Sequence, residues 1–124
     1  MVPVVLLGHG SRSAQANTDL AAVARLIREH TGWPVVEPAF MELAQPSLEE
    51  AVSRLAAAGA RQIVVMPFFL FPGMHVRRDI PGQIQRLRER FPGLEVTFAR
   101  HLGVDRRLAE LAAQRIAEAH RPPR

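Results

Sequence analysis

Residues 4–12 read Val-Val-Leu-Leu-Gly-His-Gly-Ser-Arg, a short apolar run that leads into a histidine between two glycines. A run that is apolar on both faces is typical of a strand buried in a parallel sheet. Similar runs occur at residues 35–40, 63–66 and 94–98, and each precedes a longer stretch with helical periodicity. Four strand–helix units predict an α/β fold in three layers, with a four-stranded parallel sheet flanked by helices.

The predicted helices carry start and stop signals. The first is expected to end at Gly32, and the second to begin with a capping box of Ser47 and Glu50. The third is expected to start near Asp79, just before Pro81, and the fourth at Asp105. The apolar faces that should pack on the sheet are Leu20, Val23, Ala24 and Ile27; Leu48, Ala51, Val52 and Leu55; Ile84, Leu87 and Phe91; and Leu108, Leu111, Ala112 and Ile116.

The length of the chain predicts one domain, because 124 residues normally enclose a single core. We expect this domain to span residues 1–120 and residues 121–124 to form a frayed tail. A flavodoxin-like strand order, 2-1-3-4, is the predicted topology. In that order the sheet reverses between its first and third strands, and ligands bind beyond the carboxyl ends of the strands at such a point.

The composition excludes several classes of site. The chain has no cysteine, which leaves imidazole and carboxylate as the plausible metal ligands. All sixteen basic residues are arginine and the net charge is +4, which suits acidic small molecules at least as well as nucleic acid. The arginines are spread over the helices without a nucleic-acid-binding motif, so no nucleic-acid partner is expected. With no membrane-length apolar run and no signal-peptide pattern, we expect a cytoplasmic protein without a membrane partner.

Three predicted loops at the carboxyl ends of the strands carry the unusual residues. The first holds His9, the second Glu42 and the third His75. If the predicted strand order holds, these loops meet over one cleft, and the two histidines face each other. A histidine after a strand is more often structural than a ligand, so neither one alone would indicate a metal site. Together, in a chain without thiols, they favour a shared metal site at His9 and His75.

Other residues of these loops have a functional and a structural interpretation. Glu42 is either a ligand or proton acceptor, or an ordinary solvated carboxylate. The segment Phe68-Phe69-Leu70-Phe71 is either core or the wall of a site for a flat apolar ligand, to which Gly73 would allow close approach. Arg12, Arg77 and Arg78 either bind acidic groups of a ligand or lie free on the surface.

The same segments resemble a known family, the short sirohydrochlorin chelatases, which include cobaltochelatases, ferrochelatases and nickelochelatases. The resemblance covers nearly the whole chain. It is carried by Gly8-His9-Gly10-Ser11-Arg12, by Ala39-Phe40-Met41-Glu42 with Pro46, and by residues 67–81 from Pro67-Phe68-Phe69-Leu70 to Pro81. The block from His75 to Pro81 is its most specific part, whereas Gly-His-Gly-Ser alone is a weak signal.

The resemblance implies a chelatase, a lyase that inserts Co²⁺ or Fe²⁺ into sirohydrochlorin in cobalamin or sirohaem biosynthesis. It implies that His9 is a metal ligand and the proton acceptor, and that His75 is the second ligand. Because short members are similar to half of the longer chelatases, it also implies a homodimer. Relatives often carry an acidic residue near Gln45, which here can donate and accept hydrogen bonds but cannot act as a base. The implied tetrapyrrole-binding residues are Gly10, Ser11, Arg12, Gln45, Leu70, Phe71, Pro72, Gly73, Met74 and Arg77.

The chemistry of these residues suits metal insertion. Two imidazoles with assistance from Glu42 leave coordination positions open, as the transfer of a metal ion requires. A free imidazole titrates near pH ~6.5 and can take a proton that the macrocycle releases. The metal is then a substrate, most plausibly Co²⁺ with Fe²⁺ or Ni²⁺ as alternatives, and no organic cofactor is expected. Two other hypotheses stay open: a non-catalytic carrier of divalent metal, and a flavodoxin-like binder of nucleotide or phosphate at residues 8–13.

Overall fold

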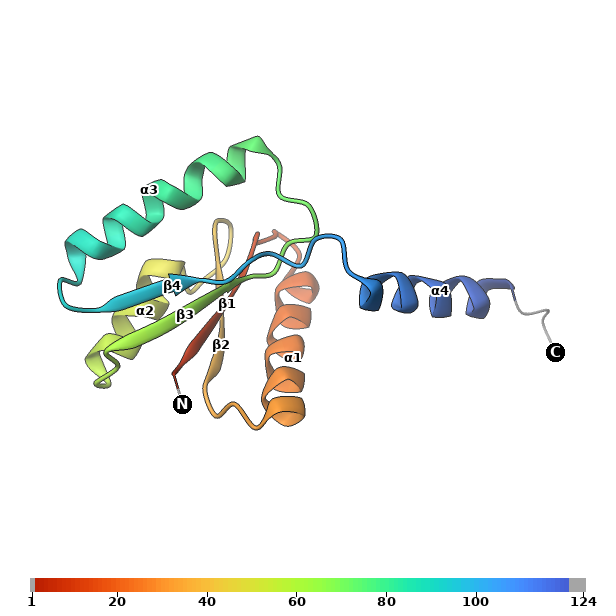
Figure 1. Cartoon of the computed structure of the whole chain (residues 1–124), viewed down its shortest axis with the longest axis horizontal. Coiled ribbons are helices and arrows are strands. Elements are labelled where there is room, and N and C mark those ends of the chain that lie inside the picture. The colour runs from red at the N-terminus through yellow and green to blue at the C-terminus, as the bar shows by residue number, and fades with distance from the viewer. Residues whose placement is uncertain (1, 121–124) are drawn as a thin grey trace.

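The structure of the chain is a computed structural model that describes residues 2–120, with only the backbone of His75. The expected fraying of residues 121–124 lies outside the described residues. Strands and helices alternate four times along the chain (Figure 1). They are β1 (Val4–Gly8), α1 (Ala14–Thr31), β2 (Val36–Phe40), α2 (Leu48–Ala57), β3 (Gln62–Pro67), α3 (Met74–Arg90), β4 (Glu95–Phe98) and α4 (Arg106–His120).

The four strands form one parallel sheet in the order β2-β1-β3-β4, which confirms the predicted topology. β1 lies between β2 and β3, with Val4 opposite both Val36 and Val64. The carboxyl ends of β1, β2 and β3 therefore lie at one edge of the sheet. This edge is where the three loops with the predicted site residues begin.

Two apolar layers enclose the sheet. On one face, β1, β2 and β3 pack against α2 and α3 through a cluster that includes Leu7, Val52 and Leu87. On the other face, α1 packs against β1 and β2 through Leu20 and Ala24. Side chains that point to opposite faces alternate along each strand, as the continuous apolar runs predict. The three-layer arrangement is therefore confirmed.

The predicted signals at the ends of α1 and α2 act as expected. Gly32 ends α1 in the left-handed conformation, with φ of 72°, and its N–H donates to the Arg28 carbonyl oxygen at 2.8 Å. At the start of α2, the Glu50 N–H donates to Ser47 Oγ at 3.1 Å. The Ser47 N–H in turn donates to Glu50 Oε1 at 3.0 Å, which completes the capping box.

The predicted start of the third helix is wrong by about one and a half turns. α3 begins at Met74 rather than near Asp79, so His75 lies in its first turn and Pro81 lies inside the helix. Proline has no N–H to donate to the carbonyl four residues earlier, and it is therefore expected at the first turn of a helix. The prediction therefore placed Pro81 in the first turn, whereas in the structure Pro81 lies more than one turn after the start of α3.

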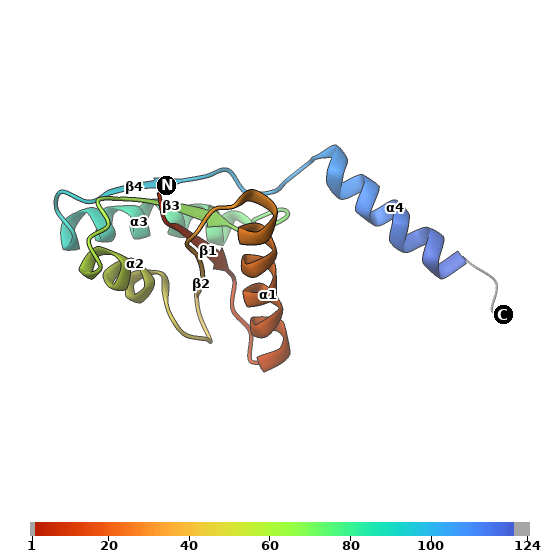
Figure 2. The ribbon, with the colours of Figure 1, turned by 90° about the horizontal axis from the view of Figure 1, so that it is seen from below.

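The expected packing of the fourth helix is also wrong for the single chain. None of the residues in α4 is buried, although Leu108, Leu111, Ala112 and Ile116 were predicted to pack on the sheet. Figures 1 and 2 show α4 projecting away from the sheet and the other helices. The amphipathic pattern predicted the helix itself correctly but did not determine what its apolar face contacts.

No helix within residues 2–120 has both the length and the apolar character needed to cross a membrane.

Candidate functional site

His9 and Glu42 come together at the carboxyl edge of the sheet. His9 directly follows β1 and Glu42 lies two residues beyond β2. The His9 Nε2 atom lies 3.4 Å from Glu42 Oε1, and the two side chains are 56% and 59% exposed. This distance exceeds the roughly 2.7–2.9 Å of a charge-assisted hydrogen bond. The interaction between the two side chains is therefore weak, both are open to solvent, and either side chain can bind a third group.

The backbone holds the two loops together more firmly than the side chains do. The Met41 N–H donates to the Gly8 carbonyl oxygen at 3.0 Å, and the Glu42 N–H donates to the His9 carbonyl oxygen at 3.2 Å. Gly10 has φ of 97°, and a Cβ atom there would lie 1.7 Å from the carbonyl oxygen of Glu42. Only glycine fits this position, both for its backbone conformation and for its contact with the second loop.

The first loop is also braced by its own side chains. The Ser11 N–H donates to Asn17 Oδ1 at 3.1 Å, and Asn17 Nδ2 donates to the Ser11 carbonyl oxygen at 2.8 Å. Ser11 Oγ accepts from the Ser13 N–H at 3.0 Å, and Ser13 caps α1. Ser11 thus has a structural role besides its predicted contact with substrate. Asn17, the fourth residue of α1, was not among the residues that the sequence singled out.

The segment after β3 supplies an apolar wall beside His9. The rings of Phe69 and His9 meet edge to face, with centroids 6.2 Å apart. Phe68 packs against the core on the side of α1, whereas Leu70 and Phe71 are exposed, at 48% and 71%. The core interpretation therefore holds for Phe68, and the exposed wall is formed by the residues that follow it.

The remaining predicted residues lie at the same edge but make few contacts with one another. Met74 is 67% exposed in the first turn of α3, and a Cβ atom at Gly73 would meet nothing within 4 Å. Arg77 Nε donates to the Pro72 carbonyl oxygen at 3.2 Å, which ties this arginine to its own loop. Arg12 and Gln45 are exposed.

The predicted pairing of His9 with His75 is only partly described. β1 and β3 are neighbours, and His75 lies in the helix that follows β3, so the two loops are adjacent. Among the described side chains, which do not include that of His75, no three His, Asp or Glu residues gather as a ready metal site. The shared ligand pair therefore stays a prediction.

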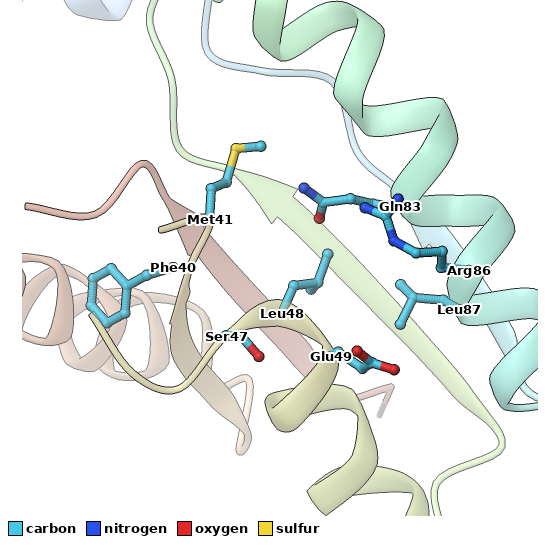
Figure 3. A pocket seen from close by; sticks show the side chains of 8 residues that line it. All are labelled: Phe40, Met41, Ser47, Leu48, Glu49, Gln83, Arg86 and Leu87. Atoms are coloured by element: carbon cyan, nitrogen blue, oxygen red, sulfur yellow. The ribbon is translucent and has the colours of Figure 1, made fainter. Parts of the chain in front are cut away.

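Sequence reasoning missed a cavity of about 170 Å³ between the start of α2 and α3 (Figure 3). It contains none of the predicted site residues. Gln83 and Arg86 reach toward it from α3, and Met41 borders it from the residue after β2 (Figure 3). The full lining is Phe40, Met41, Ser47, Leu48, Glu49, Gln83, Arg86 and Leu87.

Comparison with known proteins decides the family. Residues 3–119 match the model of the family described as CbiX. This chain belongs to the CbiX family. The resemblance seen in the sequence motifs is thereby confirmed.

Similar CbiX-family proteins differ in length. The chain is 36% identical over 139 residues to a sirohydrochlorin cobaltochelatase from Methanopyrus kandleri, covering 96% of this chain and 97% of that one. It is 39% identical over 113 residues to the chloroplastic sirohydrochlorin ferrochelatase of Arabidopsis thaliana, covering 91% of this chain. It spans only 50% of that plant protein.

Solved structures agree with the fold. A CbiX protein from Marinobacter aquaeolei superposes with a TM-score of 0.83 at 32% identity, covering 96% of this chain and 97% of that one. The sirohydrochlorin chelatase SirB from Bacillus subtilis subspecies spizizenii, solved in complex with cobalt, gives a TM-score of 0.84 at 30% identity. That match covers 95% of this chain and 51% of SirB.

Proposed function

We propose that this chain is a sirohydrochlorin chelatase, which inserts Co²⁺ or Fe²⁺ into sirohydrochlorin for cobalamin or sirohaem biosynthesis. The observation that carries the proposal is the exposed His9–Glu42 pair beside an apolar wall, at the carboxyl edge of a CbiX-family sheet. The names of its relatives, cobaltochelatases and ferrochelatases, support both metals.

In the proposed mechanism, His9 binds the incoming metal ion and accepts a proton from the macrocycle, and His75 is the second protein ligand. Insertion replaces two pyrrole N–H protons by one divalent ion, so two protons must leave the ring. His9 takes one, and the second passes to Glu42 or to water. The negative charge of Glu42, 3.4 Å from His9, balances the positive charge that a proton or metal ion brings to the imidazole.

The openness of the site suits transfer rather than storage. A structural metal site surrounds its ion with four protein ligands, whereas a site that hands over its metal must keep positions free. His9 and Glu42 are both more than half exposed, so a macrocycle can approach the ion from solvent. Phe69 meets the His9 ring edge to face, and Leu70, Phe71 and Met74 in the segment that follows it are exposed apolar groups on which we propose that the flat ring stacks.

Arg12 and Arg77 are proposed to bind the carboxylates at the rim of the macrocycle, with Gln45 and the loop residues Gly10 and Ser11 as further contacts. Both arginines are exposed at the edge of the sheet that carries His9. The guanidinium group binds carboxylates through two parallel hydrogen bonds, and it stays charged over the whole physiological pH range.

Two further proposals concern the molecule in the cell. We infer a homodimer, because the chain spans half of the plant ferrochelatase and half of SirB, so two copies match the length of either. A cytoplasmic location stays a prediction from the sequence. The plant relative is named as a chloroplastic protein.

The proposed reaction can be followed by the visible spectrum of sirohydrochlorin as Co²⁺ or Fe²⁺ is inserted. Loss of a general base typically costs about 10²–10⁴ in rate, so we expect His9→Ala to fall within that range. His30→Ala is the matched control, because His30 is exposed near the far end of α1, away from the site. Full activity of both His9→Ala and His75→Ala would disprove the assignment. Tight metal binding without insertion would instead favour a metal carrier.

A further inference from the structure

One leucine beside the candidate site has an unusual backbone conformation. Leu43 directly follows Glu42 in the loop between β2 and α2, and it has φ of 63°. Within the described residues it is the single residue other than glycine with a positive φ. In this left-handed region the Cβ atom of an L-residue is crowded by the backbone, so a bulky side chain there destabilises the fold.

The same leucine also exposes its side chain to water. Leu43 is 58% exposed, although an apolar side chain gains free energy when it leaves water. An exposed leucine is by itself common on protein surfaces. An exposed leucine in the left-handed conformation is not, because glycine or asparagine adopts that conformation at a lower cost. Strained residues of this kind gather at sites that bind ligands.

Hydrogen bonds on both sides of Leu43 explain why the chain turns there. The Glu42 N–H donates to the His9 carbonyl oxygen at 3.2 Å, and the Phe40 N–H donates to the Pro46 carbonyl oxygen at 2.9 Å. These two bonds fix both ends of the loop, so the chain has to reverse within a few residues. The conformation of Leu43 therefore follows from the course of the loop.

The neighbours of Leu43 show where its side chain lies. Met41 packs against the core that includes α2 and α3, and Ala44 packs against the core on the side of α1. Leu43, between them in the chain, belongs to neither core and is exposed, as is the side chain of Glu42. Glu42 and Leu43 thus form the tip of the loop, at the carboxyl edge of the sheet.

Apolar side chains consequently lie on both sides of His9. β1, which His9 follows, lies between β2 and β3. The loop with Leu43 is therefore on one side of His9, and the segment with Leu70 and Phe71 is on the other (Figure 1). Two strands that flank a third lie about 10 Å apart, which is comparable with the breadth of a tetrapyrrole ring. A flat ring centred over His9 spans both groups.

We propose that Leu43 is a further contact for the macrocycle, on the side of His9 opposite Leu70 and Phe71. Burial of the leucine side chain under the ring provides free energy that offsets its strain. The Cα atoms of Leu43 and Glu42 are neighbours, about 3.8 Å apart. The contact therefore holds one edge of the ring within reach of the carboxylate that we assign to proton transfer.

This inference rests on the proposed function, because it names another contact of the same macrocycle. Leu43 has no group that binds a metal ion or a proton, so it acts on the ring alone. The ring makes this contact before insertion as well as during it. Such uniform binding affects KM for the macrocycle and leaves kcat nearly unchanged.

Leu43→Asn distinguishes a ligand contact from a structural leucine. Asparagine tolerates a positive φ better than leucine does and offers little apolar surface. We expect the variant to unfold at the same or a higher urea concentration than the wild type. We also expect it to bind metal-free sirohydrochlorin about five- to twentyfold more weakly in equilibrium dialysis. In the insertion assay, KM for sirohydrochlorin should rise by a similar factor while kcat changes little.

Two further variants serve as controls. Leu26 is also 58% exposed, but it lies in the second half of α1, which runs away from the carboxyl edge. Leu26→Asn should unfold at a lower urea concentration, because asparagine is a poorer helix former, and should bind sirohydrochlorin as the wild type does. Leu43→Met keeps an apolar side chain of similar volume and should bind nearly as tightly as the wild type.

The outcomes separate this inference from the proposed function. Wild-type binding by Leu43→Asn would show that the macrocycle does not reach this residue, and a lower urea midpoint would show that the fold needs the leucine. Leu43→Met that binds as weakly as Leu43→Asn would show that the contact is not apolar. Each of these results overturns the inference and leaves the proposed function standing. A wild-type chain that binds no sirohydrochlorin would refute the proposed function, and this inference with it.

Discussion

Gly10 and His9 show how one loop serves both structure and chemistry. His9 contributes the side chain that we assign to metal and proton, and its carbonyl oxygen accepts from the Glu42 N–H at 3.2 Å. Gly10 leaves the space that lets the two loops approach, with no room for a Cβ atom beside Glu42. The position of Glu42 relative to His9 is thus set by the backbone, not by the exposed side-chain pair, which adds little to stability.

Gly10→Ala tests this arrangement. The new Cβ atom would lie 1.7 Å from the Glu42 carbonyl oxygen, and φ of 97° is strained for alanine. We expect a loss of at least about 1–2 kcal/mol in unfolding free energy and a large loss of chelatase rate, because the second loop must shift. Urea unfolding and the insertion assay measure the two effects.

Gly82→Ala is the matched control for that variant. Gly82 lies inside α3, where a Cβ atom would meet only the Arg86 side chain at 3.6 Å. Alanine is preferred over glycine in a helix by about 0.5–1 kcal/mol, so stability should hold or rise. Equal stability of Gly10→Ala and the wild type would contradict the packing that we describe.

Individual site residues could be predicted from the sequence only where the type of side chain carried the information. His9 and Glu42 were found because imidazole and carboxylate follow neighbouring buried strands. The bracing of Ser11 by Asn17 could not be found, because the two hydrogen bonds depend on the path of the loop. In the segment after β3, Phe68 belongs to the core whereas Leu70 and Phe71 are exposed. A loop has no regular periodicity from which the sequence could have predicted this difference.

At the scale of elements, a helix boundary could be predicted where two local signals agreed, but not where the prediction depended on a single proline. Ser47 and Glu50 fixed the start of α2, since both halves of the capping box are local. The start of α3 that was predicted from Pro81 was wrong, because the preference of proline for the first turn of a helix is only statistical. The resemblance covered this segment but gave no helix boundary.

The capping box of α2 predicts a pH effect on stability. Hydrogen bonding from the Ser47 backbone and side chain lowers the pKa of Glu50, with a smaller contribution from the charge of Arg54 and against a small effect of desolvation. Since the pKa is lower in the folded chain, the charged carboxylate stabilises α2 above the pKa of the unfolded state. That stabilisation is lost as the pH falls through the folded pKa.

We therefore expect Glu50→Gln to be less stable than the wild type near neutral pH and to approach it as the pH falls through the folded pKa of Glu50, where the carboxyl group becomes as uncharged as the glutamine amide. Urea unfolding over a series of pH values, from neutral downward, measures the difference. Glu29→Gln, an exposed change in α1 away from its start, should show no such convergence. A loss of stability in Glu50→Gln that stays the same size over the whole pH series would refute the role of the charge.

For the whole molecule, the sequence predicted the sheet and its order but not where the last helix packs. The strand pattern and the crossover rules act within one chain, and the strand order 2-1-3-4 follows from them. The amphipathic face of α4 indicates that something covers it, without showing whether its own sheet or another copy does so. The Leu102 N–H donates to the Phe69 carbonyl oxygen and the Gly103 N–H donates to the Leu70 carbonyl oxygen, so the link to α4 is attached to the segment after β3, a contact that is visible only in three dimensions.

The overall charge predicts how the proposed reaction responds to salt. The chain carries a net charge of +4, and the proposed substrate bears carboxylates around its ring. Attraction between them raises the rate of encounter, and salt screens it as the Debye length shortens. We expect kcat/KM to fall roughly three- to tenfold between about 0.02 and 0.2 M salt, while kcat at saturating substrate changes little.

Two arginine variants test whether the substrate is attracted by a local charge at the site or by the net charge of the chain. Arg12 is exposed in the loop after β1, whereas Arg61 is exposed just before β3, at the opposite edge of the sheet. Each substitution by glutamine removes one positive charge, so the net effect on the whole molecule is the same. Arg12→Gln should lower kcat/KM at low salt and flatten its salt dependence, whereas Arg61→Gln should do neither. Equal effects of the two variants would show that the substrate responds to net charge alone, and the proposed carboxylate contact of Arg12 would be wrong.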